Sequence, residues 1–356
     1  MSDISQRKSE HLDLCATDQV AFQDKTTLLE QVGLVHDALP ELAVADVGLH
    51  TTLVGHELSA PVVIAAMTGG TERAHAVNRD LASVAEELGI GFGFGSMRPL
   101  LEAGIEAGYQ VRDVAPGALI LGNLGIVQAR AASTAQIARM VEQTGCSALC
   151  VHLNPAMEVI QPGGDDDFRG GLQVLERLVQ QLPVPVIAKE TGCGLSRSVG
   201  RRLRDVGIEA VDVSGAGGTS WVGVETLRAR ARTRRLGELF WDWGIPTAAS
   251  VAQLSGLGLQ IVATGGVADG LDVARAMALG ATAGGMARRF LMAWNEGGRE
   301  GVRIAADEVV EELRIACLLT GCASPRQLAE RPVVLGPQLR AWLPPDSPLA
   351  LRTTGG

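Results

Sequence analysis

The sequence predicts one α/β domain folded as a TIM (β/α)8 barrel, with an N-terminal arm and extra C-terminal helices. Apolar runs and helical patterns alternate about eight times along the 356 residues, more than an open doubly wound sheet usually needs. The apolar runs are continuous rather than alternating, which is typical of parallel strands buried on both faces. Two late runs, 211–220 and 261–266, end abruptly in glycines, as the last strands of such barrels often do.

The elements follow from this pattern in chain order. An arm, residues 1–60, contains a Thr/Val-rich segment and precedes a barrel expected over 61–295. The strands are expected at 61–66, 89–93, 118–122, 148–152, 185–189, 210–213, 259–263 and 281–285. The helical patterns between them lie at 75–88, 134–144, 171–182, 196–206, 246–256 and 269–279, and Ser196 and Asp269 are suitable N-caps. Residues 299–319 form an amphipathic pattern, and the Pro-rich tail, 331–356, is expected to be irregular.

Composition narrows the function. Hydrophobic residues make up 46% of the chain, so 1–356 can bury one large core as a single domain whose last part is 296–356. The net charge of −9, the absence of a basic block and an aromatic content of 3% exclude nucleic acid as a partner. No apolar run reaches the roughly 18 residues of a membrane span, and residues 1–10 lack a signal-peptide core. We therefore expect a cytoplasmic protein with no membrane partner, whose six cysteines, without CxxC or zinc spacing, are buried in a reducing compartment.

The glycine-rich strand ends predict a phosphate-binding site. Residues 214–220 read Ser-Gly-Ala-Gly-Gly-Thr-Ser and residues 264–266 read Thr-Gly-Gly. Such loops leave backbone N–H groups unobstructed, which suits an anionic phosphate. In a TIM barrel the last βα loops often build this cradle at the C-terminal face. We expect a phosphorylated cofactor or substrate to lie there.

Polar side chains end the other strands. His152 and Asn154 are two residues apart, so a strand places both on one face. A lone histidine is more often a core residue, but the paired asparagine and the strand-end position favour a ligand role. Lys189 ends a buried apolar run and needs an anionic partner. Because Glu190 points to the opposite face, we expect a ligand's negative charge to be that partner.

Three further groups of charged residues have weaker patterns. Glu158 is a candidate magnesium ligand, because Mg2+ favours one or two carboxylates together with substrate phosphate oxygens. Residues 165–167 are three consecutive aspartates that cannot all point the same way, so we interpret them as a solvated loop. Arg7 and His11 share a helix face, beside Lys8, and offer positive charge for a phosphate-rich ligand.

Together these motifs resemble the type 2, FMN-dependent isopentenyl diphosphate isomerase family, from Arg7 to about Arg326. In this order and spacing they are highly specific. They are Arg7-Lys8-x-x-His11, Ala66-Met67-Thr68-Gly69-Gly70, Gly95-Ser96-x-Arg98, Gly122-Asn123-Leu124-Gly125, His152-x-Asn154-Pro155, Lys189-Glu190-x-Gly192-x-Gly194-Leu195-Ser196, Gly215-Ala216-Gly217-Gly218-Thr219-Ser220-Trp221, and Gly280-Ala281 through Met286-Ala287-Arg288.

The resemblance implies a homo-oligomeric barrel, a tetramer or octamer, that holds FMN and interconverts isopentenyl and dimethylallyl diphosphate. It implies reduction of the flavin by NADPH and an Mg2+ ion on Glu158. The FMN contacts that it implies are Met67, Thr68, Ser96, Asn123, Lys189, Ser214 and Thr219, with the phosphate on Gly217, Gly218, Gly265, Gly266, Met286 and Ala287. The contacts that it implies for the prenyl diphosphate are Arg7, Lys8, His11, Arg98, His152, Asn154 and Gln161.

Two positions depart from the family pattern. The family has a glutamine, important in proton transfer, immediately before the metal-binding glutamate, and this chain has Met157. Methionine cannot donate or relay a proton. Gly163 also replaces a family glutamate, whereas Glu225 matches a family acid near the reacting end of the substrate. Met157 and Glu225 are therefore the candidate catalytic positions.

Met157 leaves two alternatives beside the isomerase. One is a flavoenzyme that acts on a different phosphorylated or apolar substrate, and the other is a catalytically silent FMN-binding protein. An FMN-dependent hydroxy-acid oxidase is excluded, because that chemistry needs a His-Gly-Gly-Arg type loop and the chain has no such run.

Overall fold

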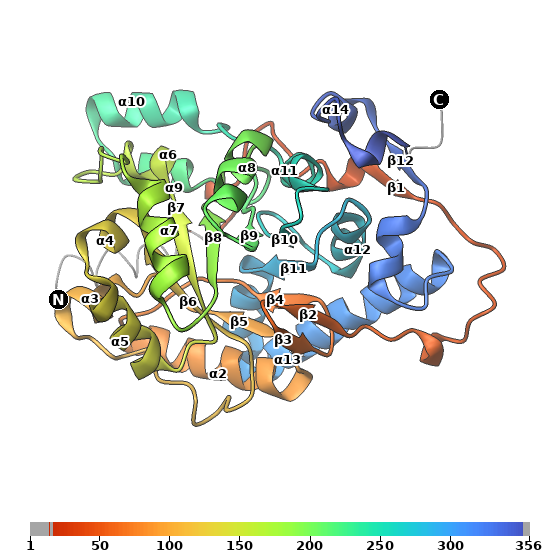
Figure 1. Ribbon diagram of the computed structural model, residues 1–356, viewed down its shortest axis with the longest axis horizontal. Helices are drawn as coiled ribbons and strands as arrows, with labels where there is room; N and C mark the ends of the chain where they lie inside the picture. Colours follow the sequence, from red (N-terminus) through yellow and green to blue (C-terminus); the bar gives the residue numbers. More distant parts are fainter. Residues whose placement is uncertain (1–13, 15–16, 352–356) are drawn as a thin grey trace.

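The computed structural model describes residues 14 and 17–351 and confirms the predicted barrel. Eight parallel strands close on themselves in the order β10-β11-β4-β5-β6-β7-β8-β9, inside a ring of helices (Figure 1). All eight predicted strands are present, with ends shifted by a few residues. They are β4 (Val62–Ile64), β5 (Gly91–Gly93), β6 (Ile120–Gly125), β7 (Ala148–Leu153), β8 (Val186–Glu190), β9 (Ala210–Asp212), β10 (Gln260–Ala263) and β11 (Ala283–Met286).

The six predicted helices are also present. They are α2 (Glu72–Leu88), α5 (Thr134–Thr144), α7 (Gly171–Gln181), α8 (Arg197–Asp205), α11 (Thr247–Leu254) and α12 (Gly270–Ala278). The side chains of Ser196 and Asp269 cap α8 and α12 by accepting backbone N–H groups three residues on, as predicted. Five further helices were not predicted: α3 (Arg98–Ala103), α4 (Ile126–Ala131), α6 (Pro155–Glu158), α9 (Trp221–Arg228) and α10 (Ala231–Phe240).

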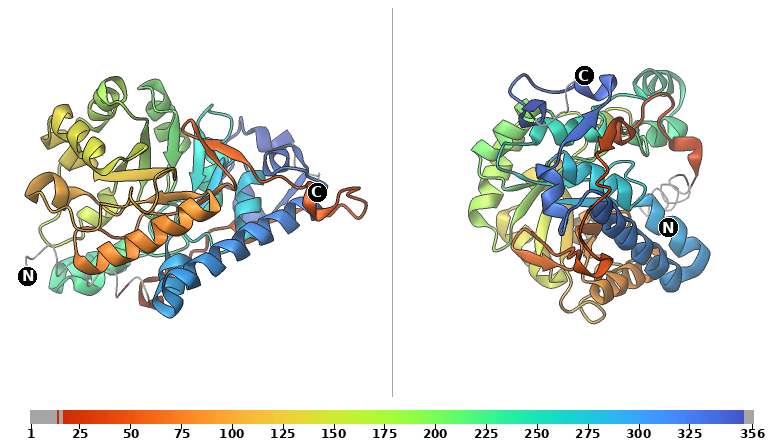
Figure 2. Two further views of the ribbon diagram at one scale, coloured as in Figure 1. Left: turned by 90° about the horizontal axis from the view of Figure 1, so that it is seen from below. Right: turned by 90° about the vertical axis from the view of Figure 1, so that its right-hand side faces the viewer.

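A long helix, α13 (Arg288–Leu319), follows the last strand and runs beside α2 (Figures 1 and 2). Trp294 Nε1 donates to Asp80 Oδ2 of α2 at 2.8 Å, and Arg299 Nε donates to Ser83 Oγ at 3.0 Å. Gly298 interrupts the helical backbone with φ 57° and ψ −145°. The helical pattern predicted from the sequence, 299–319, is the part of α13 after this break.

The N-terminal end of the barrel is closed by a hairpin from the arm. Its strands are β2 (Thr51–Leu53) and β3 (His56–Leu58), the Thr/Val-rich segment of the sequence. Leu53 and Leu58 are buried in one apolar cluster with the inward-facing side chains of the barrel strands, such as Ile187. The hairpin therefore leaves the opposite, C-terminal end as the face for a ligand.

The arm and the tail also form a two-stranded sheet, β1 (Val32–Leu34) with β12 (Val333–Leu335). A short helix, α14 (Pro337–Arg340), follows. The prediction that 331–356 is irregular is therefore wrong over these residues. The physical reason is that β12 pairs with a strand from the other end of the chain, so no local pattern reveals it.

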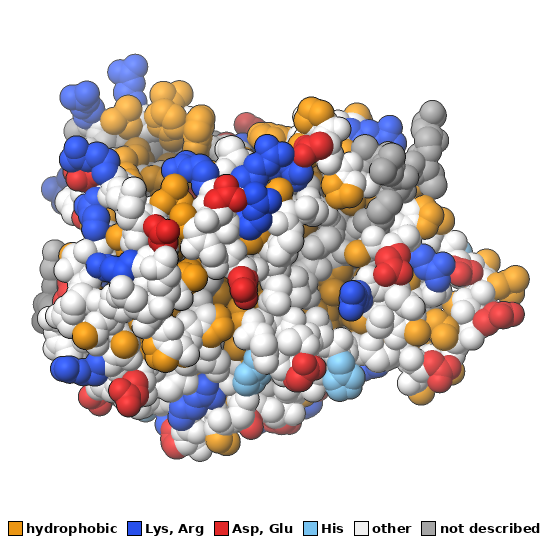
Figure 3. All heavy atoms as spheres, in the orientation of Figure 1, with side chains coloured by type: hydrophobic (Ala, Val, Ile, Leu, Met, Phe, Trp, Pro, Cys, Tyr) orange, Lys and Arg blue, Asp and Glu red, His pale blue; other side chains and the backbone are white. Residues whose placement is uncertain are grey.

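On the face seen in Figure 3, acidic and basic side chains are interspersed, and apolar side chains gather at the upper left over α10. The exposed side chains there are Leu236, Leu239, Phe240 and Trp243. Within residues 14 and 17–351, no helix is long and apolar enough to span a bilayer.

Candidate active site

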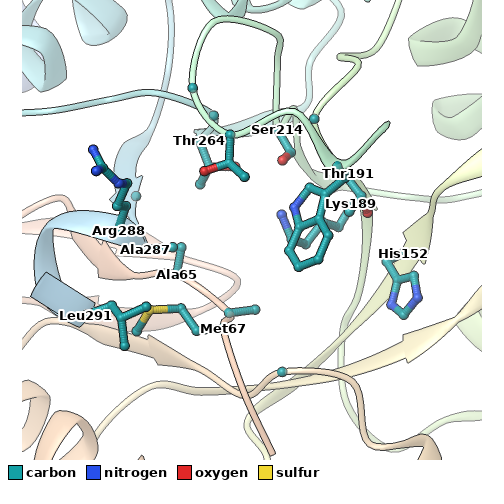
Figure 4. A pocket seen from close by; sticks show the side chains of 18 of the residues that line it. Ala65, Met67, His152, Lys189, Thr191, Ser214, Thr264, Ala287, Arg288 and Leu291 are labelled. Atoms are coloured by element: carbon teal, nitrogen blue, oxygen red, sulfur yellow. The ribbon is translucent and has the colours of Figure 1, made fainter. Parts of the chain in front are cut away.

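A cavity of about 570 Å3 opens at the C-terminal end of the barrel, and residues after all eight strands line it (Figure 4). A cavity of this size suits a small-molecule cofactor and substrate. The predicted site residues that line it are Met67, Thr68, Ser96, Arg98, Asn123, His152, Asn154, Met157, Glu158, Gln161, Lys189, Ser214, Gly217, Gly218, Thr219, Gly265, Gly266, Met286 and Ala287.

The predicted phosphate cradle is built from backbone. A Cβ on Gly218 would lie 2.4 Å from the nitrogen of Gly266, so the two glycine loops pack main chain against main chain. Within the part of the chain that the structure describes, the N–H groups of Gly218 and Gly266 have no hydrogen-bond acceptor. Unpaired N–H groups facing a cavity fit an anionic phosphate.

The N-terminal arm lies across this cradle. Phe22 N–H donates to the carbonyl oxygen of Gly218 at 3.2 Å, and Ser220 N–H donates to that of Val20 at 2.7 Å. A Cβ on Gly217, whose φ is +117°, would lie 2.2 Å from the nitrogen of Thr27. The arm thus holds the outer side of the glycine loop, and Thr17, Asp18 and Ala21 extend the cavity wall.

A second observation also fits a bound flavin. The Thr68 hydroxyl is buried, lines the cavity and has no hydrogen-bond partner within residues 14 and 17–351. A buried polar group without a partner is costly, so a ligand atom is the expected partner. Together with the backbone cradle, Thr68 fits the predicted role in binding FMN.

Lys189 is paired with a protein carboxylate. Its Nζ lies 2.9 Å from Asp212 Oδ2, and both side chains are about nine-tenths buried. The other oxygen, Asp212 Oδ1, accepts from the N–H of Ser214 at 3.1 Å and from the Thr264 hydroxyl. The expectation that a ligand's charge would be the partner of Lys189 is therefore wrong. The physical reason is that Asp212 on β9, the strand beside β8, is in register with Lys189, and no local sequence pattern records this pairing.

His152 is held as a neutral ring. Burial, and then the positive charge of Lys189, lower the pKa of His152 to about 4. Asn123 Nδ2 donates to the Phe94 carbonyl oxygen at 3.1 Å, which turns Asn123 Oδ1 toward His152 Nδ1 at 2.8 Å. The neutral ring therefore carries its proton on Nδ1 and leaves Nε2 as an acceptor.

The carboxylate of Glu158 lies in a shell of donors. Asn154 Nδ2 donates to Oε1 at 2.7 Å, while Gln161 Nε2 and the N–H of Asp165 donate to Oε2 at 3.2 and 3.0 Å. Asp165 thus takes part in the site through its backbone, which the interpretation of 165–167 as a solvated loop missed. Among the described residues, no group of three or more His, Cys, Asp or Glu side chains is placed to hold a metal ion.

The arginines at the cavity, Arg98 and Arg288 among them, have carboxylate partners. Arg98 Nε lies 2.9 Å from Glu102 Oε2, one turn along α3, and Arg288 Nη2 lies 2.7 Å from Asp18 Oδ1 of the arm. Both pairs are well exposed, so an anionic ligand can compete for either arginine at small cost. Figure 4 shows Arg288 and His152 on opposite sides of the cavity.

The two predicted catalytic residues, Met157 and Glu225, differ in whether they line the cavity. Met157 lines the cavity from α6, with its sulfur 3.8 Å from Asn154 Nδ2. Glu225 is fully buried in α9, its Oε2 lies 2.7 Å from Arg228 Nη1, and it is not among the described residues that line the cavity. Arg7, Lys8 and His11 lie outside the described residues.

The sequence assigned no role in this site to three residues, Asp212, Thr264 and Arg288, although Thr264 and Arg288 lie at predicted strand ends. Asp212 carried a signal, because an acid inside an apolar strand needs a partner and the neighbouring strand ends in a lysine. Thr264 directly precedes the glycine pair on which the prediction of the phosphate cradle rests. Arg288 is the last residue of the final motif of the resemblance.

The FMN-dependent dehydrogenase family matches residues 2–159 and 165–334. The isopentenyl-diphosphate delta-isomerase of Methanosarcina barkeri is 43% identical over 341 residues, which cover 94% of this chain and 93% of that protein. The isopentenyl-diphosphate delta-isomerase of Methanothermobacter thermautotrophicus is 42% identical over 343 residues, with 96% of each chain covered. A solved structure of mandelate oxidase with (S)-4-hydroxymandelic acid has a TM-score of 0.64 at 19% identity, covering 94% of this chain and 98% of that one. At this identity the likeness to the oxidase concerns the fold alone.

Proposed function

This chain belongs to the FMN-dependent dehydrogenase family and, within it, to the isopentenyl-diphosphate delta-isomerases, and on that premise we propose that it interconverts isopentenyl and dimethylallyl diphosphate with bound FMN. The observation that carries the proposal is a single cavity with two different anion-binding ends. The glycine loops at 217–218 and 265–266 form one end, and the side chains of His152, Asn154 and Glu158 form the other.

The first end holds the cofactor in this proposal. The unpaired N–H groups of Gly218 and Gly266 would donate hydrogen bonds to the FMN phosphate, and the Thr68 hydroxyl would pair with a polar atom of the flavin. Reduced FMN supplies an electron-rich ring that stabilises positive charge on a protonated alkene and can carry a proton. The other predicted flavin contacts are Met67, Ser96, Asn123, Lys189, Ser214, Thr219, Gly217, Gly265, Met286 and Ala287.

The second end holds the substrate diphosphate with Mg2+. Glu158 is a single carboxylate, and Mg2+ commonly combines one or two carboxylates with substrate phosphate oxygens. Two of its present donors, Asn154 and Gln161, are side-chain amides that can turn to the diphosphate when the metal binds Glu158. Arg98 can exchange Glu102 for a phosphate oxygen, and Arg7, Lys8 and His11 are predicted to add further positive charge.

His152 supplies a proton-linked contact to the diphosphate. In its neutral form the ring has Nε2 as an acceptor, so it has no N–H to offer a phosphate oxygen there. Protonation at Nε2 makes the ring a donor at both nitrogens, and an adjacent anion raises the pKa of the ring. We propose that the diphosphate and this proton bind together.

Further features of the proposal concern the setting of the enzyme. NADPH is the proposed reductant of the flavin, and the cytoplasm is the proposed location. A homo-oligomer, tetramer or octamer, is proposed, and the exposed apolar side chains over α10 support it. Sequence composition favours neither nucleic acid nor membrane as a partner.

The direct test is a turnover assay. Purified protein is incubated with isopentenyl diphosphate, FMN, NADPH and Mg2+ under anaerobic conditions, and dimethylallyl diphosphate is measured. The proposal expects product that requires both FMN and the reductant, and less product when EDTA removes the metal. A protein that binds FMN but forms no product would overturn the isomerase and leave the two alternatives, a flavoenzyme with another substrate and a catalytically silent FMN-binding protein.

A further inference from the structure

A single buried carboxylate connects three residues of the cofactor cavity. Asp212 contacts Lys189 near the end of β8, Ser214 after β9 and Thr264 after β10, and these three strands are adjacent. All three residues line the cavity, whereas Asp212 lies beneath them, at a small void on the barrel side. Figure 4 shows Lys189, Ser214 and Thr264 on the same side of the cavity.

The contacts of Asp212 divide between its two oxygens. Oδ1 accepts the two neutral donors, the N–H of Ser214 and the hydroxyl of Thr264, while Oδ2 faces the ammonium group of Lys189 at 2.9 Å. Ser214 has a φ of +34°, a conformation that is strained for a residue with a Cβ. The hydrogen bond from the Ser214 N–H to Asp212 therefore stabilises a strained turn, while the other oxygen of the same carboxylate pairs with Lys189.

Charge balance is the second consequence of this geometry. Lys189 and Asp212 are 8% and 7% exposed, so water screens their charges weakly. A lysine alone beside a flavin favours the reduced form, which is the more electron-rich, and so raises the reduction potential. A lysine paired with a carboxylate presents almost no net charge at a distance, so this preference is largely cancelled.

We propose that Asp212 is a positioning and charge-compensating residue that keeps Lys189 oriented and lowers the reduction potential of the bound flavin. This inference rests on the proposed binding of FMN and goes beyond it, because it concerns what the chain does to the flavin. A lower potential keeps the reduced ring electron-rich, which is the property that the proposed isomerase uses.

The test compares three variants, Asp212→Asn, Lys189→Met and the double variant. In Asp212→Asn the side-chain oxygen can still accept from Ser214 and Thr264, so the turn keeps its acceptor and the lysine loses its counter-charge. The ratio of FMN affinities in the reduced and oxidised states is measured by titration, and the potential by equilibration with a reference dye. Neither readout requires turnover.

Opposite shifts are expected from the two single variants. Asp212→Asn should favour reduced over oxidised FMN about tenfold, which is about +30 mV for a two-electron couple. Lys189→Met should shift the ratio about tenfold the other way, and the double variant should return to within threefold of the unmodified protein. If Asp212→Asn does not fold, the double variant compared with Lys189→Met still tests the compensation.

Other outcomes overturn the inference. Single variants that shift the ratio in the same direction, or that weaken both redox states equally, would make Asp212 merely structural. A double variant that keeps the potential of Lys189→Met would show that Asp212 does not compensate. Failure of the unmodified protein to bind FMN would instead contradict the proposed function, so the two failures are distinguishable.

Discussion

The two ends of the cavity are built from different parts of the chain. The cradle after β9 and β10 consists of main chain, in which Gly218 and Gly266 pack closely and present N–H groups. The end after β7 consists of side chains, from His152 to Glu158. A Cβ added to Gly218 or Gly266 would disturb the backbone cradle, whereas each side chain of the other end can be replaced separately. A substitution at the side-chain end, such as one at Met157, can therefore change the cavity wall without disturbing the backbone cradle.

The largest effect is expected at the side-chain end. Met157→Gln places at the cavity wall the amide that the family resemblance implies for this position. Because general acid–base groups typically contribute ~10²–10⁴-fold, isomerase turnover should rise about a hundredfold, with FMN affinity unchanged. Isomerase turnover is measured from the steady-state formation of dimethylallyl diphosphate, and FMN affinity is measured by fluorescence titration.

Met157→Leu is the matched control, since it keeps an apolar side chain of similar volume and should give no such rise. Equal turnover in all three proteins would show that the proton does not pass through this position. A loss of turnover in Met157→Gln would favour a substrate shaped to the thioether, and so a different flavoenzyme.

The backbone end is tested by Gly218→Ala. The new Cβ would meet the nitrogen of Gly266 at 2.4 Å, so the two loops must separate. Overpacking costs up to about 3 kcal/mol, which corresponds to about a hundredfold loss of FMN affinity. Gly48→Ala is the control, because nothing lies within 4 Å of its Cβ and it should bind FMN normally. Normal flavin binding by Gly218→Ala would refute the cradle.

A smaller effect is expected from Glu158→Gln. Losing one charged ligand should raise the Mg2+ concentration for half-maximal turnover about tenfold, in line with the 1.5–3 kcal/mol of a charged contact. The affinity for FMN should not change, because Glu158 belongs to the other end. Turnover that is indifferent both to EDTA and to this variant would remove the metal from the proposal.

The smallest effect is expected from Glu190, whose side chain accepts hydrogen bonds from backbone N–H groups. It faces away from Lys189 on β8, and its Oε2 accepts the N–H groups of Thr191, Cys193 and Gly194. Burial raises the pKa of Glu190 to about 8, although these hydrogen bonds oppose the shift. The folded state thus holds a proton that the unfolded state loses above pH 4.5, so stability falls as the pH rises from 4.5 to 8.

Glu190→Gln removes this titration. The melting temperature of the variant should exceed that of the unmodified protein by a few degrees at pH 9. The difference should vanish at pH 4, where the Glu190 carboxyl is protonated in both the folded and the unfolded protein. Thermal melts followed by circular dichroism across this range measure the effect. A difference that is independent of pH would contradict the assignment.

The sequence predicted the barrel because buried parallel strands and their helices leave local patterns, such as the apolar run before Lys189 and the N-cap at Asp269. It predicted the cradle because the glycines are adjacent in sequence. It missed β12, whose partner is β1, and the role of Asp212, whose partners lie on neighbouring strands. Such contacts depend on strand order and register, which no local pattern records. The assigned roles of Met157, Glu225 and the basic residues at 7, 8 and 11 remain predictions.

The arm that crosses the cradle also sets an order of events during synthesis. Its N–H groups at Gln23, Asp24 and Lys25 donate to the carboxylate of Asp242, and Lys25 Nζ reaches the Gly244 carbonyl 219 residues further along the chain. A ribosome that has made the arm must therefore translate most of the barrel before the arm can dock. Contacts of such long range slow folding, and the cradle reaches its final form only after β9 and β10 exist. We expect the nascent chain to acquire flavin late, and a chain halted before Asp242 to acquire none.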